Sequence, residues 1–195
     1  MIRFFIFLVS ILVVFSNYLV YKSNKHQVVL LNDAKSNQYS LSKNQLAEIN
    51  YKYPSLTINS VPTLTYISRY NTNNNDYDIA IKQLKESLSS NPNSIYTKYL
   101  LSRNFIYKND FQNAEKFLQQ IFDESPNIES STVLYLSVLE KNENKIKLYN
   151  IFDIMTKLEN KNIWSYYLSA IKNNTNIPSD SLLFNKTLLF FQNKF

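Results

Sequence analysis

The first clear pattern along the chain is an apolar run near the amino terminus. It spans Phe4–Val20, and only two serines and Asn17 interrupt it. At about 1.5 Å per residue, a helix of this length reaches the lower limit for crossing a bilayer. No small-x-small cleavage site is evident near Ser16 or Ser23, so we expect a retained transmembrane anchor, residues 1–24. The alternative is a secreted soluble protein with a cleaved leader, which N-terminal sequencing of the mature chain would decide.

Positive charges flank both ends of this run. Arg3 and the amino terminus lie on one side, and Lys22 and Lys25 lie on the other. The positive-inside rule therefore nearly cancels. We expect a single-pass protein of the inner membrane, inserted through residues 4–20, with the remainder of the chain in the periplasm.

The next segment, residues 25–58, is polar with helical spacing and predicts two short connecting helices. Val28, Leu31 and Ala34 form a short apolar stripe. A turn with an N-cap follows at Tyr39–Ser42. The second helix would present Leu46, Ile49 and Tyr53 and end at Pro54.

A second pattern, between Asn75 and Asn127, repeats at a constant offset. At this offset Asn75, Asp76, Ala80, Leu84, Pro92 and Asn93 return as Asn109, Asp110, Ala114, Leu118, Pro126 and Asn127. A shared offset at so many positions is typical of a helix-turn-helix repeat, which cannot bury its apolar face alone and stacks on its neighbours. We call the step from Asn75 to Asn109 one repeat length, and we assign residues 59–195 to one helical-repeat domain.

Each repeat is expected to contain two helices joined by an Asn-rich turn. The first repeat has helices at Val61–Tyr70 and from Asp76 to Asn91, the latter presenting Ile79, Ala80, Leu84 and Leu88. The second repeat has helices at Ile95–Tyr107 and from Phe111 to Pro126. The small Ala80 and Ala114 predict the closest approach of the paired helices, and Asp76 and Asp110 predict N-caps.

Beyond Pro126 the apolar spacing continues without the signature. It predicts a third pair of helices, then the first helix of a fourth pair, and finally a terminal helix. Their apolar residues are Val133, Leu136 and Leu139; Ile146, Tyr149, Phe152 and Met155; Ile163, Tyr166, Tyr167, Ala170 and Ile171; and Leu182, Leu183, Leu188, Leu189 and Phe190.

These residues resemble the tetratricopeptide repeat. The second repeat carries its pattern in Leu101, Ser102, Phe105, Asn109-Asp110-Phe111, Ala114, Leu118 and Pro126, with Asn109 in place of the usual Gly. The first repeat matches through Ile67, Ser68, Asn75-Asp76-Tyr77, Ala80, Leu84 and Pro92, but has Asn71 where an aromatic residue is expected. The resemblance implies an all-α, tetratricopeptide-like helical-repeat solenoid behind one N-terminal transmembrane helix.

From Ala34 onward the order of features also resembles the soluble tail of O-antigen ligase and polymerase proteins of Bacteroidota. After the apolar span come Ala34-Lys35, Tyr39-Ser40-Leu41, Tyr51-Lys52-Tyr53-Pro54-Ser55-Leu56, Tyr66-Ile67-Ser68-Arg69-Tyr70, the two repeats and Ile163-Trp164-Ser165-Tyr166-Tyr167. The multi-span membrane core that carries glycosyl transfer in that family is missing. The resemblance therefore implies a detached or stand-alone tail, to which no catalytic residue carries over.

Composition excludes several classes of function. The 195 residues contain no Gly, which rules out Gly-rich phosphate loops and dinucleotide fingerprints, and no Cys, which rules out disulfides and thiolate chemistry. The single His26 makes a His-based metal site or a catalytic triad hard to build. The net charge of +6 is spread among alternating acids, unlike a nucleic-acid track. We expect no enzyme activity, cofactor, metal or nucleic-acid partner.

The concave face of stacked helix pairs is the candidate binding site. The register places six residues in this groove: Thr65, Arg69, Tyr96, Tyr99, Arg103 and Tyr107. Arg69 and Arg103 are one repeat length apart and should project in parallel, and two guanidinium groups among Tyr rings suit a carboxylate, an acidic peptide or an anionic sugar. The alternative is that both arginines only solvate the groove or pair with local acids.

The other aromatic residues are interpreted as core. Tyr77, Tyr149, Tyr166 and Trp164 lie at packing positions. The sequence thus favours a non-catalytic, membrane-anchored adaptor that binds a protein or peptide, such as a membrane protein of cell-envelope polysaccharide assembly. The competing class is an enzyme component, a detached tail whose catalytic membrane core is encoded separately.

Overall fold

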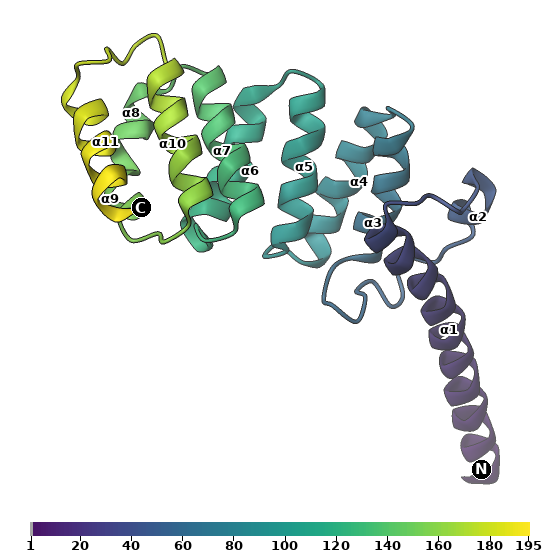
Figure 1. Cartoon of the computed structure of the whole chain (residues 1–195). Helices are drawn as coiled ribbons and strands as arrows, with labels where there is room; N and C mark the ends of the chain where they lie inside the picture. The colour runs from purple at the N-terminus through teal and green to yellow at the C-terminus, as the bar shows by residue number, and fades with distance from the viewer. Residues whose placement is uncertain (1) are drawn as a thin grey trace. The chain divides into compact units, whose positions relative to one another are not determined.

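The computed structural model describes residues 2–195, which form eleven helices (Figure 1). In chain order these are α1 (Ile2–Ser36), α2 (Lys43–Ala47), α3 (Thr63–Asn73), α4 (Tyr77–Ser90), α5 (Ile95–Tyr107), α6 (Phe111–Glu124), α7 (Glu129–Lys141), α8 (Lys145–Asn150), α9 (Phe152–Met155), α10 (Lys161–Asn173) and α11 (Leu182–Lys194). Within this described range there is no strand, only an isolated bridge between Leu56 and Pro62. The all-α prediction is confirmed. Met1, the first residue of the expected anchor, lies outside the described residues.

The chain divides into two compact units, one reaching Thr97 and the other starting at Lys98, so the border falls within α5. In the first unit α3 packs against α4 and against α1. In the second unit α7 packs against both α6 and α10, and α10 packs against α11.

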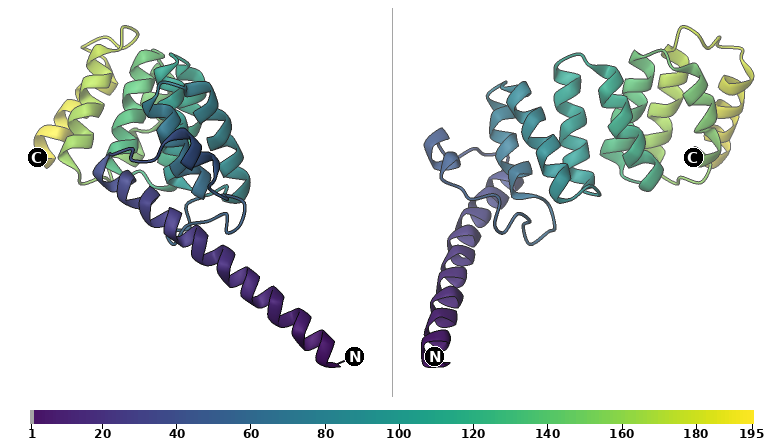
Figure 2. Two further views of the ribbon diagram at one scale, coloured as in Figure 1. Left: turned by 90° about the vertical axis from the view of Figure 1, so that its right-hand side faces the viewer. Right: turned by 180° about the vertical axis from the view of Figure 1, so that it is seen from behind.

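Helix α1 is one uninterrupted helix of 35 residues, and its part from Phe4 onward is long and apolar enough to cross a membrane. In both views of Figure 2 its amino-terminal part projects away from the rest of the first unit. The predicted separate helix around Val28–Ala34 is therefore wrong, because α1 continues through it without a break. Nothing in residues 21–36 stops a helix, since neither Pro nor Gly occurs there.

Helix α2 begins where the sequence predicts. Ser42 forms a capping box with Gln45: its Oγ accepts from the Gln45 amide, and the Gln45 side chain accepts from the Ser42 amide. The helix ends at Ala47, well before Pro54, so only the start of this prediction is confirmed. Ile49 is buried, whereas Tyr53 is exposed.

One turn geometry occurs three times, at intervals of one repeat length. Asn75, Asn109 and Glu143 have φ of 63°, 59° and 50°, in the left-handed region that favours Gly and then Asn. The next residue each time donates its amide to a carbonyl five residues back: Asp76 to Asn71 at 2.8 Å, Asp110 to Phe105 at 2.9 Å and Asn144 to Leu139 at 2.9 Å. The third turn escaped the sequence signature because Glu143-Asn144-Lys145 replaces the Asn-Asp-aromatic triplet.

The two alanines of the signature are fully buried, as predicted. The two aspartates at the helix starts differ in their capping hydrogen bonds. Ala80 and Ala114 are each 0% exposed. Asp110 accepts a hydrogen bond from the Asn113 amide at 3.1 Å, which confirms its capping role. Asp76 is the N-cap residue of α4, as predicted, but its side chain makes no capping hydrogen bond.

Trp164 centres the core of the second unit. It is fully buried, stacks on Phe190 with ring centroids 4.7 Å apart, and donates its indole N–H to the Leu158 carbonyl at 2.9 Å. Tyr167 is also fully buried and donates its hydroxyl to the Leu148 carbonyl. The core role predicted for Trp164 is confirmed.

Some predicted core residues are exposed instead. Ile79, Ile146 and Tyr166 are 46%, 73% and 51% exposed. The predicted second helix of the third pair is divided into two short helices, α8 and α9, which meet at Ile151. The buried residues there are Leu148, Ile151, Met155 and Leu158. Tyr77 and Tyr149 are only half-buried.

Candidate functional site

Arg69, on α3, faces the connector that follows α1. Its side chain is half-buried, its Nη2 donates to Asn37 Oδ1 at 3.2 Å, and its guanidinium carbon lies 5.9 Å from the centroid of the Tyr39 ring. Asn37 ends α1 in the left-handed conformation, with φ of 54°. Arg69 thus contacts a segment of its own unit, which the repeat register could not reveal.

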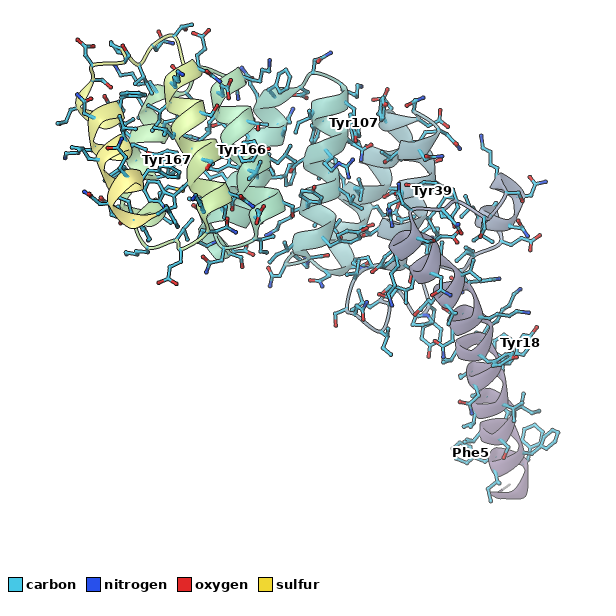
Figure 3. The ribbon with its side chains drawn as sticks, viewed as in Figure 1. Phe5, Tyr18, Tyr39, Tyr107, Tyr166 and Tyr167 are labelled. Carbon is cyan, nitrogen blue, oxygen red and sulfur yellow. The ribbon has the colours of Figure 1, made fainter. Side chains whose placement is uncertain are left out.

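Asp33 fixes the same connector to α3. Its Oδ2 accepts from the Ser40 amide and the Ser40 hydroxyl, each at 2.8 Å, and from the Tyr70 hydroxyl. The Tyr70 ring also packs edge-on against Tyr39, with centroids 5.2 Å apart (Figure 3 labels Tyr39). We call Asp33, Tyr39, Ser40 and Tyr70 the clasp.

Charge and burial act together in the clasp. Burial alone would raise the pKa of Asp33, but hydrogen bonds from Tyr70 and Ser40 and the positive charge of Arg69 outweigh it, so the pKa lies below its usual value of 3.8. Burial, followed by the bond to Asp33, raises the pKa of the Tyr70 hydroxyl. Asp33 therefore stays ionised and Tyr70 stays protonated at neutral pH.

Hydrophobic periodicity does not reveal the clasp, because the face of α1 that packs on α3 is mostly polar. Ser23, Gln27, Leu30 and Asp33 are buried, at the spacing of one helix face. Of the predicted apolar stripe, Leu31 and Ala34 are half-buried against the core of the first unit, as expected, whereas Val28 is 58% exposed.

Thr65 and Tyr96 lie inside the first unit. Thr65 is fully buried and its Oγ1 lies 2.8 Å from Thr97 Oγ1, so each hydroxyl satisfies the other. Thr65 cannot contact a partner, and its assignment to the groove is wrong. Tyr96 is half-buried against Tyr66, with ring centroids 5.7 Å apart.

Tyr99, Arg103 and Tyr107 form one cluster on α5, within the second unit. Their spacing of four residues places them on one helix face. The Arg103 guanidinium carbon lies 5.9 Å from the Tyr99 ring centroid and 5.6 Å from that of Tyr107, and Nη2 donates to the Tyr107 hydroxyl at 2.5 Å. Tyr107 is 43% exposed. We call these three residues the α5 cluster.

The structure thus places the six predicted residues in three settings. Thr65 and Tyr96 pack inside the first unit, Arg69 contacts the connector, and Tyr99, Arg103 and Tyr107 stand together on α5. Because Arg69 and Arg103 belong to different units, the expectation that they share one groove stays a prediction.

Comparison with known proteins adds no assignment to this geometry. No protein-family model matches the chain, and no curated protein matches it as a relative.

The first unit also has a small surface pocket. A pocket of about 250 Å³ in the first unit is lined by residues that include Tyr51, Lys52, Ser55 and Glu86. Its lining has hydroxyls and charges but no His, so it suits polar contacts better than nucleophilic chemistry. Across residues 2–195, no group of three or more acidic or His side chains is placed to hold a metal ion.

Proposed function

We propose that this protein is a non-catalytic, membrane-anchored adaptor whose helical repeats are of the tetratricopeptide type and bind an acidic protein segment. The observation that carries the proposal is the α5 cluster, in which Arg103 lies between two tyrosine rings on one helix face. The anchor is α1, inserted through residues 4–20 in the inner membrane, with the repeats in the periplasm.

The repeat assignment is supported by two independent regularities. The sequence signature recurs after one repeat length, and the left-handed turn recurs at the same spacing a third time, at Glu143, where the signature has been lost. A structural period that outlasts its sequence signature is typical of repeat proteins, whose units each bury their apolar face on the next.

The chemistry of the α5 cluster favours a carboxylate ligand. A guanidinium group offers planar N–H donors that match carboxylate oxygens, and flanking tyrosine rings stabilise it in place. Tyr107 adds a phenolic hydroxyl that can donate to the same carboxylate. An acidic peptide segment satisfies these groups and follows the helix face over its two turns.

The test measures binding of a fluorescent Glu-rich octapeptide to the full-length protein in lipid nanodiscs. We expect Arg103→Ala to weaken binding about tenfold or more, with Arg103→Lys recovering part of the loss. Lys116→Ala is the matched control, since it removes one exposed charge from the same unit and should leave binding unchanged. A matched Gln-rich peptide should not bind.

Equal weakening by Arg103→Ala and Lys116→Ala would show that only net charge attracts the peptide, and the α5 cluster would lose its role. In cells, Arg103→Ala should also remove proteins that co-purify with the solubilised wild-type chain, and an unchanged set would count against the adaptor function.

A second candidate is the detached soluble tail of an O-antigen ligase or polymerase, with glycosyl transfer carried by a separate membrane core. It is favoured by the direct passage of α1 from its apolar part into contact with α3, as expected of a tail that follows a membrane helix. Stable co-purification with one multi-span membrane protein encoded nearby would favour this candidate over the adaptor.

A further inference from the structure

One face of α1 carries a continuous seam of exposed residues spaced alternately by three and four. The seam runs over three heptads and consists of Phe7, Ser10, Val14, Asn17, Tyr21, Asn24 and Val28, all of them exposed. This spacing is that of the a and d positions through which two helices pair in a left-handed coiled coil.

The soluble part of the chain leaves this seam uncovered. At about 100° per residue, the seam lies roughly 160° around α1 from the face formed by Ser23, Gln27, Leu30 and Asp33, which packs in the first unit. Phe5 and Tyr18 extend from the same helix with no other described element beside them (Figure 3). A partner can therefore approach the seam while α1 keeps its contact with α3.

Asn17 is the seam residue whose side chain is least favourable in the hydrocarbon region of a bilayer. It lies five residues from the centre of the apolar run, about 7–8 Å from the bilayer midplane and well inside the hydrocarbon half-thickness of about 15 Å. Ser10, also in the run, donates its hydroxyl to the Ile6 carbonyl at 2.9 Å and so satisfies itself. An Asn side chain at that depth needs a partner on another helix.

Beyond the membrane the seam stays apolar in part. Tyr21 is 70% exposed and Val28 is 58% exposed, whereas the exposed residues of α1 between them, Lys22, Asn24 and Lys25, are polar. Lipid cannot cover Val28, which lies eight residues past the apolar run. One partner helix that continues past the membrane surface would cover both parts of the seam.

We propose that α1 pairs through this seam with α1 of a second copy of the chain, as a parallel two-helix coiled coil. An amide carries both donors and an acceptor, so two Asn17 side chains can satisfy each other, and the same holds for Asn24. Every copy enters the membrane from the same end and to the same depth, which places Asn17 opposite Asn17 and Val28 opposite Val28. An apolar hollow lined by Phe7, Ser10, Ile11, Val14, Phe15 and Tyr18 borders the amino-terminal part of the seam.

The pairing rests on the membrane anchoring proposed above and not on the ligand of Arg103. Resistance of the chain to alkaline extraction from membranes tests the anchoring separately. If the chain is extracted, the anchoring fails; if it resists but does not pair, only this inference fails.

Cysteine cross-linking in native membranes tests the seam directly, because the chain has no cysteine of its own. Under mild oxidation, Tyr21→Cys, Asn24→Cys and Val28→Cys should each yield a disulfide-linked dimer of the full-length chain. Lys22→Cys, equally exposed but about 110° away from the seam, should stay monomeric. Equal cross-linking at Lys22 and Asn24, no cross-linking at any seam position, or cross-linking to a different protein would each overturn the proposal.

The hydrogen bond between the Asn17 side chains has its own test. In Förster transfer between labelled copies in lipid vesicles, Asn17→Leu should raise the dimer dissociation constant about threefold to thirtyfold. Ser16→Leu removes a neighbouring polar group on the other side of the helix and should leave transfer unchanged. If Asn17→Leu also leaves it unchanged, Asn17 does not hold the two helices together.

Discussion

Arg69 and Arg103 occupy equivalent positions of successive repeats and have different surroundings. Arg69 donates to Asn37 and lies over Tyr39, both contributed by the connector after α1. Arg103 lies between Tyr99 and Tyr107, which its own helix supplies. The repeat register predicts where a side chain leaves its helix, but a segment outside the repeats decides whether that side chain supports the fold or remains at the surface.

Removing the clasp is the strongest test of the difference between the surroundings of Arg69 and Arg103. Asp33→Ala leaves the Ser40 amide and the Tyr70 hydroxyl without their acceptor, which should destabilise the packing of α1 on α3 by about 3 kcal/mol. Hydrogen exchange of the α3 amides in the detergent-solubilised protein should accelerate strongly. Lys35→Ala, exposed on the same helix, is the control, and equal exchange in the two variants would show that the clasp does not hold the connector.

The next test asks whether the paired helices pack in the same way in each of the two repeats. Ala80→Leu and Ala114→Leu should each overpack a fully buried position and cost about 1–3 kcal/mol, lowering the thermal unfolding midpoint. Ile79→Leu, at an exposed position of α4, should change it little. A midpoint unaffected by either Ala substitution would contradict the register from which Arg69 and Arg103 are compared.

Acid should weaken the clasp without mutation. The pKa of Asp33 is lower in the folded protein than its usual 3.8, so ionised Asp33 contributes stability above that value and the contribution is lost as the pH falls through the lower folded pKa. Exchange of the α3 amides, corrected for the intrinsic pH dependence, should therefore rise below about pH 4. Asp33→Asn should remove this acid-dependent rise, and a rise of the same size in that variant would assign it to other groups.

The smallest expected effects separate the two arginines themselves. Arg69→Ala should destabilise the first unit by about 1 kcal/mol through its lost contacts with Asn37 and Tyr39. Arg103→Ala should cost about 0.5 kcal/mol through its lost contacts with the Tyr99 and Tyr107 rings, and we expect its main effect on the proposed ligand binding. Chemical denaturation of both variants checks this order, and a larger loss for Arg103→Ala would reverse the comparison.

Local pattern was enough to predict much of the fold. The Asn turns, the start of α2 at Ser42, the bounds of α5 and the burial of Trp164 follow from caps, periodicity and positions that need left-handed backbone. These features depend on residues within one or two turns of each other. The continuity of α1 was missed because the polar residues after Val20 suggested a new element, although no helix breaker occurs there.

The candidate site was harder to predict, for reasons that lie in long-range packing. Thr65 is buried because Thr97, 32 residues later, satisfies its hydroxyl. Asp33 is buried because Tyr70, 37 residues later, donates to it. Hydrophobic periodicity reveals neither contact, since Thr and Asp are residue types usually found at the surface. Only Tyr99, Arg103 and Tyr107, which contact each other along one helix, could be grouped from spacing alone.

In the membrane-anchored arrangement proposed above, the unbroken course of α1 would set both the height of the first unit above the bilayer and its rotation about the helix axis. From Val20 to Ser36 the helix rises about 24 Å, at about 1.5 Å and 100° per residue. Lengthening this shaft by one residue between Val20 and Ser23 would lift the unit by about 1.5 Å and turn it by about 100° about the helix axis, whereas seven residues would lift it about 10 Å and nearly restore its heading. The number of residues between the apolar run and the clasp therefore determines both the distance and the rotation of the first unit relative to that run.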